Sequence, residues 1–129
     1  ILLAHGGITT LGANCVSMGI VGPFIGWVAY KGCMKLNLGS KISIFVCAFL
    51  ADIATYIVTS VQLAFAFPIP DLGAAFAKFF LVFAPTQLPL AIAEALLTLI
   101  IWNTLLSYKS DILLKLNIIN PQDVPSGEE

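Results

Sequence analysis

The chain has 129 residues, of which 59% are hydrophobic and only 10% are charged, and its formal net charge is −1. Soluble domains carry about 25% charged residues, so this chain cannot cover its surface with polar groups and falls in the integral membrane class. It contains no arginine and no basic patch, and so gives no indication of nucleic-acid binding. Its three cysteines form no Cys-x-x-Cys pair, which argues against a disulfide framework or a zinc site.

The opening stretch, residues 2–14, holds the only histidine, His5, and three of the ten glycines. Glycine-rich irregular backbone beside membrane helices is tolerated only where it is buried in protein or lines a watery cavity. A metal site needs several ligands, so the favoured interpretation is that His5 ties down this loop by hydrogen bonds. The alternatives are a supporting role beside a metal and, less favoured, direct ligation. Because the chain begins without an initiator methionine or a signal-peptide pattern, we expect a fragment that lacks its N-terminal part.

The first predicted membrane span covers residues 14–30, which form an apolar run close to the roughly 20 residues that spanning requires. Pro23 lies inside this run and predicts a kink near Val21 and Gly22, which membrane helices tolerate. Gly22 and Gly26 form a small-xxx-small pattern that lets a second helix approach closely. A lysine-bearing loop, residues 31–41, is expected to follow.

The second predicted span covers residues 42–67 and ends at a proline-rich turn. Residues 72–84 are too few to span alone, so we expect a short helix on the outer membrane face, broken by Pro85. The third predicted span covers residues 86–108. Residues 109–129 become polar, and we expect a disordered cytoplasmic tail, most clearly from residue 121 onward.

These elements predict an all-α, polytopic transmembrane bundle with three spanning helices and one short outward helix, in a transmembrane domain of residues 1–108. Five of the six lysines fall in the loop after the first span or after the third, which lie on the same side of the membrane. The positive-inside rule makes that side cytoplasmic, so we expect a multi-pass protein of the cell membrane with a cytoplasmic C-terminus.

Two carboxyl groups, Asp52 and Glu94, fall inside predicted spans, where a charge is expensive and should face the bundle interior. Each belongs to a polar stripe with helical spacing. The stripes are Asp52, Thr55, Tyr56 and Thr59, and Gln87, Ala91, Glu94 and Thr98. The favoured interpretation is that the two carboxyls are hydrogen-bond partners between helices, one of them neutral. Cation binding or transport and contact with a partner subunit are the alternatives.

Three long motifs resemble the CbiM/NikM family. They are residues 2–14, continued by Gly22-Pro23; residues 51–63, continued by Phe67-Pro68; and residues 86–98. The resemblance implies the substrate-capture membrane subunit of an energy-coupling factor transporter for cobalt or nickel. Such a subunit works with a CbiQ-like transmembrane coupling subunit, a CbiO-like ATPase and, in some systems, a CbiN-like helper. The implied substrate is a divalent metal that feeds cobalamin biosynthesis, and the implied protein is neither an enzyme nor a holder of a resident cofactor.

The family binds its metal mainly through an N-terminal Met-His segment and a second histidine loop, and neither occurs in this sequence. The resemblance therefore implies that the metal ligands lie upstream and that His5 supports the site rather than ligating the metal. The other residues it singles out are intramembrane and polar: Asn14, Asp52, Thr55, Tyr56, Gln62, Gln87 and Glu94. Two alternatives stay open, a carrier that uses Asp52 and Glu94 as a relay, and an intramembrane enzyme that uses His5 with a carboxylate.

Overall fold

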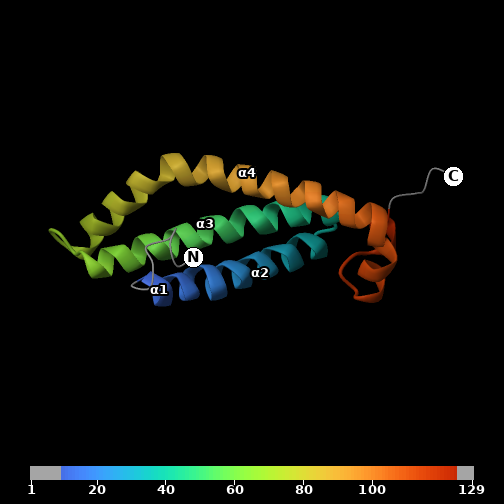
Figure 1. Ribbon diagram of the computed structural model, residues 1–129, viewed down its shortest axis with the longest axis horizontal. Coiled ribbons are helices and arrows are strands. Elements are labelled where there is room, and N and C mark those ends of the chain that lie inside the picture. Colours follow the sequence, from blue (N-terminus) through green and yellow to red (C-terminus); the bar gives the residue numbers. More distant parts are fainter. Residues whose placement is uncertain (1–9, 125–129) are drawn as a thin grey trace.

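The computed structural model describes residues 10–124, and within that range all of its regular secondary structure is helical, without a strand (Figure 1). Three segments are long and apolar enough to cross a membrane, which confirms the predicted all-α class and the three spans. The elements in chain order are α1 (Leu11–Val16), a π-helical turn (Ser17–Val21), α2 (Gly22–Lys35), α3 (Ser40–Ala66), α4 (Leu72–Lys115) and a 3-10 turn (Pro121–Asp123).

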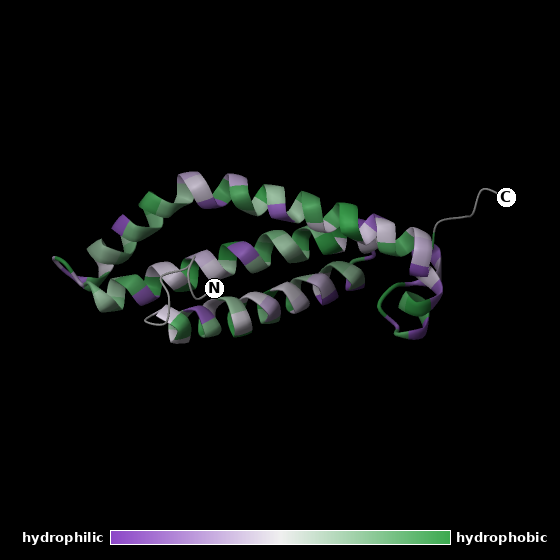
Figure 2. Ribbon diagram, viewed as in Figure 1, coloured by the Kyte–Doolittle hydropathy of each residue, from purple (hydrophilic) through white to green (hydrophobic). Residues whose placement is uncertain are grey.

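The three spans lie side by side, with α3 packed against both α2 and α4 (Figure 1). The connection between α2 and α3 lies at one end of the bundle, together with the end of α4, and the connection between α3 and α4 lies at the other. Figure 2 shows isolated hydrophilic residues within the predominantly hydrophobic α3 and α4. Of the charged residues inside the spans, Asp52 is half-buried, whereas Lys78 and Glu94 on α4 are exposed.

The first span runs from Leu11 to Lys35, further at both ends than the predicted residues 14–30. Its irregularity lies where Pro23 predicts it, as the π-helical turn Ser17–Val21, and the amide of Gly22 donates to the carbonyl of Ser17. Proline lacks an amide proton, so the turn before it can rearrange without losing a further hydrogen bond. The span extends to Lys35 because a lysine at a helix C-terminus interacts favourably with the helix dipole.

The predicted break at Pro85 is wrong, because residues 72–84 and 86–108 belong to one helix, α4, of 44 residues. Pro85 and Pro89 both lie inside it, and Figure 1 shows α4 bent between its first third and the remainder. In water an interior proline favours a helix end, whereas in a membrane neighbouring helices and local adjustments satisfy the freed carbonyls. The helix begins at Leu72 and is capped by Asp71, whose carboxylate accepts a hydrogen bond from the amide of Ala74 at 2.9 Å.

The C-terminal residues 109–124, where the sequence predicts a disordered tail, comprise the last turns of α4 and the 3-10 turn Pro121–Asp123. The backbone of Lys109 leaves helical geometry (φ −139°, ψ 26°), and the last turns of α4 then fold across the end of the bundle (Figure 1). This segment packs through an apolar cluster of buried residues: Trp102, Leu106, Leu113 and Ile119. The mostly polar composition of the tail gives no indication of this cluster. The predicted domain boundary at residue 108 remains a prediction, and residues 125–129 lie outside the described range.

Two hydrogen bonds fasten the C-terminal segment to the rest of the fold. The hydroxyl of Tyr30 donates to the carbonyl of Ile118 at 2.8 Å, and the amide of Ser40 donates to Oδ1 of Asp123 at 3.0 Å. Asp123 thereby caps the first turn of α3 from 83 residues away in the chain. A carboxylate at a helix N-terminus satisfies a free amide and complements the helix dipole.

Gly22 and Gly26 form the contact between α2 and α3, as the small-xxx-small pattern predicts. A Cβ atom on Gly26 would lie 3.2 Å from both Cβ of Ala51 and Sγ of Cys47. On Gly22 it would lie only 2.7 Å from Oγ1 of Thr55. The absence of side chains at these two positions therefore sets how closely the two helices approach.

Candidate functional site

A polar cavity of about 260 Å³ opens between the first span, α3 and α4, well inside the spanning segments. One water occupies roughly 30 Å³ of liquid, so the cavity can hold several waters or a partly hydrated ion. Ten residues line it: Asn14, Met18, Asp52, Thr55, Tyr56, Thr59, Phe83, Gln87, Leu90 and Glu94.

The cavity unites most of the two polar stripes recognised in the sequence. All four members of the α3 stripe line it, and they meet Gln87 and Glu94 from α4 across the opening. Asn14 reaches the same cavity from α1, where its amide also donates to the hydroxyl of Thr10 at 3.4 Å. Helical spacing on α3 and α4 thus produces one shared polar surface rather than two unrelated ones.

The threonine hydroxyls of the cavity wall have their protons engaged by backbone carbonyls. Thr55 shares its proton between the carbonyls of Ala51 (3.0 Å) and Ser17 (3.3 Å), and Thr59 donates to the carbonyl of Thr55 at 2.9 Å. Each hydroxyl oxygen keeps lone pairs that can accept further bonds. The wall formed by α3 is therefore a hydrogen-bond-accepting surface, which suits a proton donor or a cation.

Tyr56 forms a tightly packed part of the cavity wall. Its side chain is buried, its ring stacks on Phe80 at a centroid distance of 5.0 Å, and it meets the edge of Phe83 at 6.3 Å. Its hydroxyl donates to the backbone carbonyl of Phe80. The ring contacts and this hydrogen bond join α3 to the bent part of α4, and so fix the distance across the cavity.

Among residues 10–124, no basic side chain lines the cavity that Asp52 and Glu94 share. No lysine lines the cavity, and within residues 10–124 Oδ2 of Asp52 is buried without a hydrogen-bond partner. Asp52 on α3 and Glu94 on α4 both line this cavity. Two carboxylates that line one cavity repel each other, so a cation bound between them would stabilise the pair.

Two other predicted residues have different positions. Gln62 lies away from the cavity, and its amide donates to the carbonyl of Ala13 at 3.2 Å, so it joins α3 to α1. Thr98, the last member of the α4 stripe, donates to the carbonyl of Glu94 at 2.8 Å and does not line the cavity. His5 lies outside the described residues.

Sequence reasoning missed three apolar lining residues, Met18, Phe83 and Leu90. Met18 lies in the π-helical turn, and such turns are frequent at functional sites. Pro23, which predicts an irregular turn just before it, was the signal in the sequence that could have pointed to Met18. Across the described part of the chain, no three His, Cys, Asp or Glu side chains gather as a metal site requires. Among residues 10–124, the lining of the cavity offers oxygen donors from carboxyl, amide and hydroxyl groups.

Residues 1–112 match the sequence model of the CbiM family, described as "Cobalt uptake substrate-specific transmembrane region". The chain belongs to the CbiM family. A cobalt transport protein CbiM of Nostoc sp. is 55% identical over 121 residues, covering 92% of this chain and 46% of that protein. The corresponding protein of Anoxybacillus flavithermus is 52% identical over 110 residues, covering 84% of this chain and 44% of the relative.

A third CbiM relative, the cobalt transport protein of Listeria seeligeri, is 55% identical over 105 residues, which are 80% of this chain and 43% of that protein. The chain thus spans about half the length of the curated relatives it matches. The CbiM match covers the first two spans and the third span as far as residue 112, and it includes every residue of the polar cavity. The family and the spans together make this chain part of a multi-pass membrane protein.

Proposed function

We propose that the full-length protein is the substrate-capture subunit of a cobalt uptake transporter, with nickel as the alternative metal. The observation that carries this proposal is the CbiM family match over residues 1–112, together with relatives named as cobalt transport proteins. The residues present here supply three spans of its bundle. The same relatives are named for transport rather than for catalysis, so we propose no enzymatic activity and no resident cofactor.

The polar cavity serves, in this proposal, as the part of the metal path that passes through the membrane. Its donors are carboxylate, amide and hydroxyl oxygens, which suit hydrated hard cations, whereas selective capture of cobalt or nickel is better served by imidazole nitrogen. The cavity therefore handles the ion after its selection. The selecting ligands lie outside residues 10–124, and His5 supports them from the opening loop.

Transport is driven, in this proposal, by ATP hydrolysis in partner subunits, a CbiQ-like coupling subunit and a CbiO-like ATPase, with a CbiN-like helper as a further member. Lysines gather where α2 ends, where α3 begins and at the end of α4, all at one end of the bundle. By the positive-inside rule that end is cytoplasmic, and the C-terminus is cytoplasmic in the cell membrane. The imported metal supplies cobalamin biosynthesis.

Radiolabelled cobalt uptake by cells that carry the full-length protein with its partners tests the proposal. Uptake should depend on an intact ATPase partner, and it should continue when the proton gradient is collapsed. His5→Ala should raise the dissociation constant for cobalt while leaving the protein folded. Uptake that persists without the ATPase would contradict the capture-subunit proposal.

A second candidate function, a cation carrier with Asp52 and Glu94 as a proton relay, is favoured by one observation. Oδ2 of Asp52 is buried without a hydrogen-bond partner within the described range and faces a cavity that Glu94 also lines. Cation flux driven by a pH gradient, in vesicles that contain only the full-length protein, would establish this alternative. Absence of such flux, with ATPase-dependent uptake intact, would eliminate it.

A further inference from the structure

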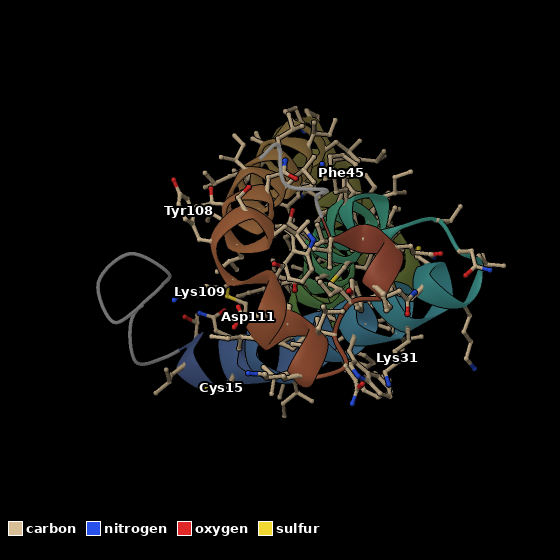
Figure 3. All side chains as sticks on the ribbon, turned by 90° about the vertical axis from the view of Figure 1, so that its right-hand side faces the viewer. Cys15, Lys31, Phe45, Tyr108, Lys109 and Asp111 are labelled. Atoms are coloured by element: carbon tan, nitrogen blue, oxygen red, sulfur yellow. The ribbon has the colours of Figure 1, made fainter. Side chains whose placement is uncertain are left out.

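A second cavity, of about 510 Å³, lies at the lysine-rich end of the bundle, away from the polar cavity. The last turns of α2 form one wall, and the chain that follows α4 forms the other. Nine residues line it: Trp27, Tyr30, Lys31, Met34, Lys35, Leu116, Asn117, Ile118 and Asn120. Figure 3 looks onto this end of the molecule, where Lys31 extends beside the C-terminal segment.

A hydrogen bond between α2 and the C-terminal segment holds the two walls together. The hydroxyl of Tyr30 donates to the carbonyl of Ile118 at 2.8 Å, so the segment is fixed against α2. The chain can turn back at this point because Asn117 adopts a left-handed conformation (φ 53°), after which Ile119 is buried in the apolar cluster. The cavity is therefore built by the fold and is not a gap between loose ends.

The lining of this cavity carries two positive charges, those of Lys31 and Lys35. Lys31 and Lys35 are both exposed, and neither ammonium forms an ion pair with a carboxylate in the part of the chain that the structure describes. The ammonium of Lys31 lies 5.5 Å from the centre of the Trp27 ring, which holds it at the cavity rim by a cation–π contact. The amides of Asn117 and Asn120 add neutral hydrogen-bonding groups.

The wall formed by α2 continues into a face of this helix that carries exposed apolar side chains. Phe24, Trp27 and Val28 are 59%, 55% and 46% exposed on α2, one to two turns deeper in the span than the lysines. Tryptophan and tyrosine at this depth are typical of the membrane–water interface. Positive charge at headgroup depth above exposed apolar side chains at acyl-chain depth is the pattern that an anionic lipid matches.

We propose that this cavity binds the phosphate headgroup of an anionic phospholipid in the leaflet at the lysine-rich end. Lys31 and Lys35 hold the phosphate, and the acyl chains lie along Phe24 and Trp27. The bound lipid joins α2 to the C-terminal segment, in addition to the hydrogen bond from Tyr30 to Ile118. This proposal does not depend on which ion the protein transports.

Native mass spectrometry of the full-length protein in a neutral detergent tests the proposal, with phosphatidylglycerol and phosphatidylcholine as probes. A neutral micelle has no charged surface, so only a lipid bound to a defined site is retained. The variant Lys31→Gln with Lys35→Gln should bind phosphatidylglycerol about 30-fold more weakly, since each lysine contributes roughly fivefold. The charge-matched control, Lys41→Gln with Lys115→Gln, removes lysines at the same end that do not line the cavity, and should change binding less than twofold.

Further results of this experiment decide whether the cavity binds an anionic lipid. Retention of phosphatidylglycerol by Lys31→Arg with Lys35→Arg would support a charge-based site in a folded protein. Equal weakening by the two glutamine pairs, or no weakening by either, would overturn the proposal, as would equal binding of phosphatidylcholine. Displacement of the lipid by inorganic phosphate at the same concentration would show a site for soluble anions and would overturn the assignment to a lipid.

Discussion

The contact between α2 and α3 depends on Gly22, and replacing it with alanine should open this contact. The new Cβ would lie 2.7 Å from Oγ1 of Thr55, and under 3.0 Å is a separation that real Cβ atoms essentially never show. Thr55 can retreat only by giving up its hydrogen bond to the carbonyl of Ser17 at 3.3 Å, or the helices can separate. Overpacking of this kind costs about 1–3 kcal/mol.

Gly32→Ala is the matched control, because it lies on the same helix and its added Cβ would meet nothing within 4 Å. Both substitutions gain the same helix propensity, about 1 kcal/mol in water, so the difference between them isolates the steric effect. We expect the free energy of unfolding of Gly22→Ala to lie about 1–3 kcal/mol below that of Gly32→Ala. The measurement is an SDS unfolding titration of the full-length protein in mixed micelles, followed by circular dichroism. Equal stability of the two variants would refute the steric argument.

Two other substitutions test particular contacts. Tyr56→Phe keeps the aromatic packing but removes the hydrogen bond to the Phe80 carbonyl, and should lower the free energy of unfolding by about 0.6–1.5 kcal/mol; no change would mean that this bond does not join α3 to α4. Asp123→Ala removes the acceptor for the amides of Ser40 and Asn120 at 3.0 and 3.3 Å, and should destabilise the start of α3 by about 0.5–2 kcal/mol. Faster hydrogen exchange at the Ser40 amide is the expected signal, and unchanged exchange would contradict the cap.

The spans and the polar cavity could be predicted because both follow from local periodicity. A long apolar run identifies a membrane helix regardless of its partners. The spacing of Asp52, Thr55 and Thr59 places them on one face of α3, and burial of a carboxyl in a membrane requires that face to point inward. The pairing of this face with Gln87 and Glu94 then follows, since these are the polar groups available on the next span.

The remaining features depend on contacts that sequence spacing does not reveal. The continuity of α4 through Pro85 depends on how a membrane environment treats proline, and a rule drawn from helices in water predicts a break there. The fold of the C-terminal segment depends on Leu113 and Ile119 joining an apolar cluster with Trp102, and on Asp123 reaching Ser40 across 83 positions of the chain. A composition-based estimate of disorder contains no information on such distant partners.

The central claim is that the polar cavity takes part in cobalt transport, and uptake by a carboxyl-neutral cavity tests it most directly. The variant Asp52→Asn with Glu94→Gln keeps the size of both side chains and removes their charge. Asp111→Asn is the control, since Asp111 is exposed and does not line the cavity. The initial rate of radiolabelled cobalt uptake by the full-length protein with its partner subunits should fall at least about tenfold in the double variant, because losing even one favourable interaction of about 1.4 kcal/mol changes a rate tenfold. It should change less than twofold in the control. An unchanged rate in the double variant, at equal protein level in the membrane, would contradict the account.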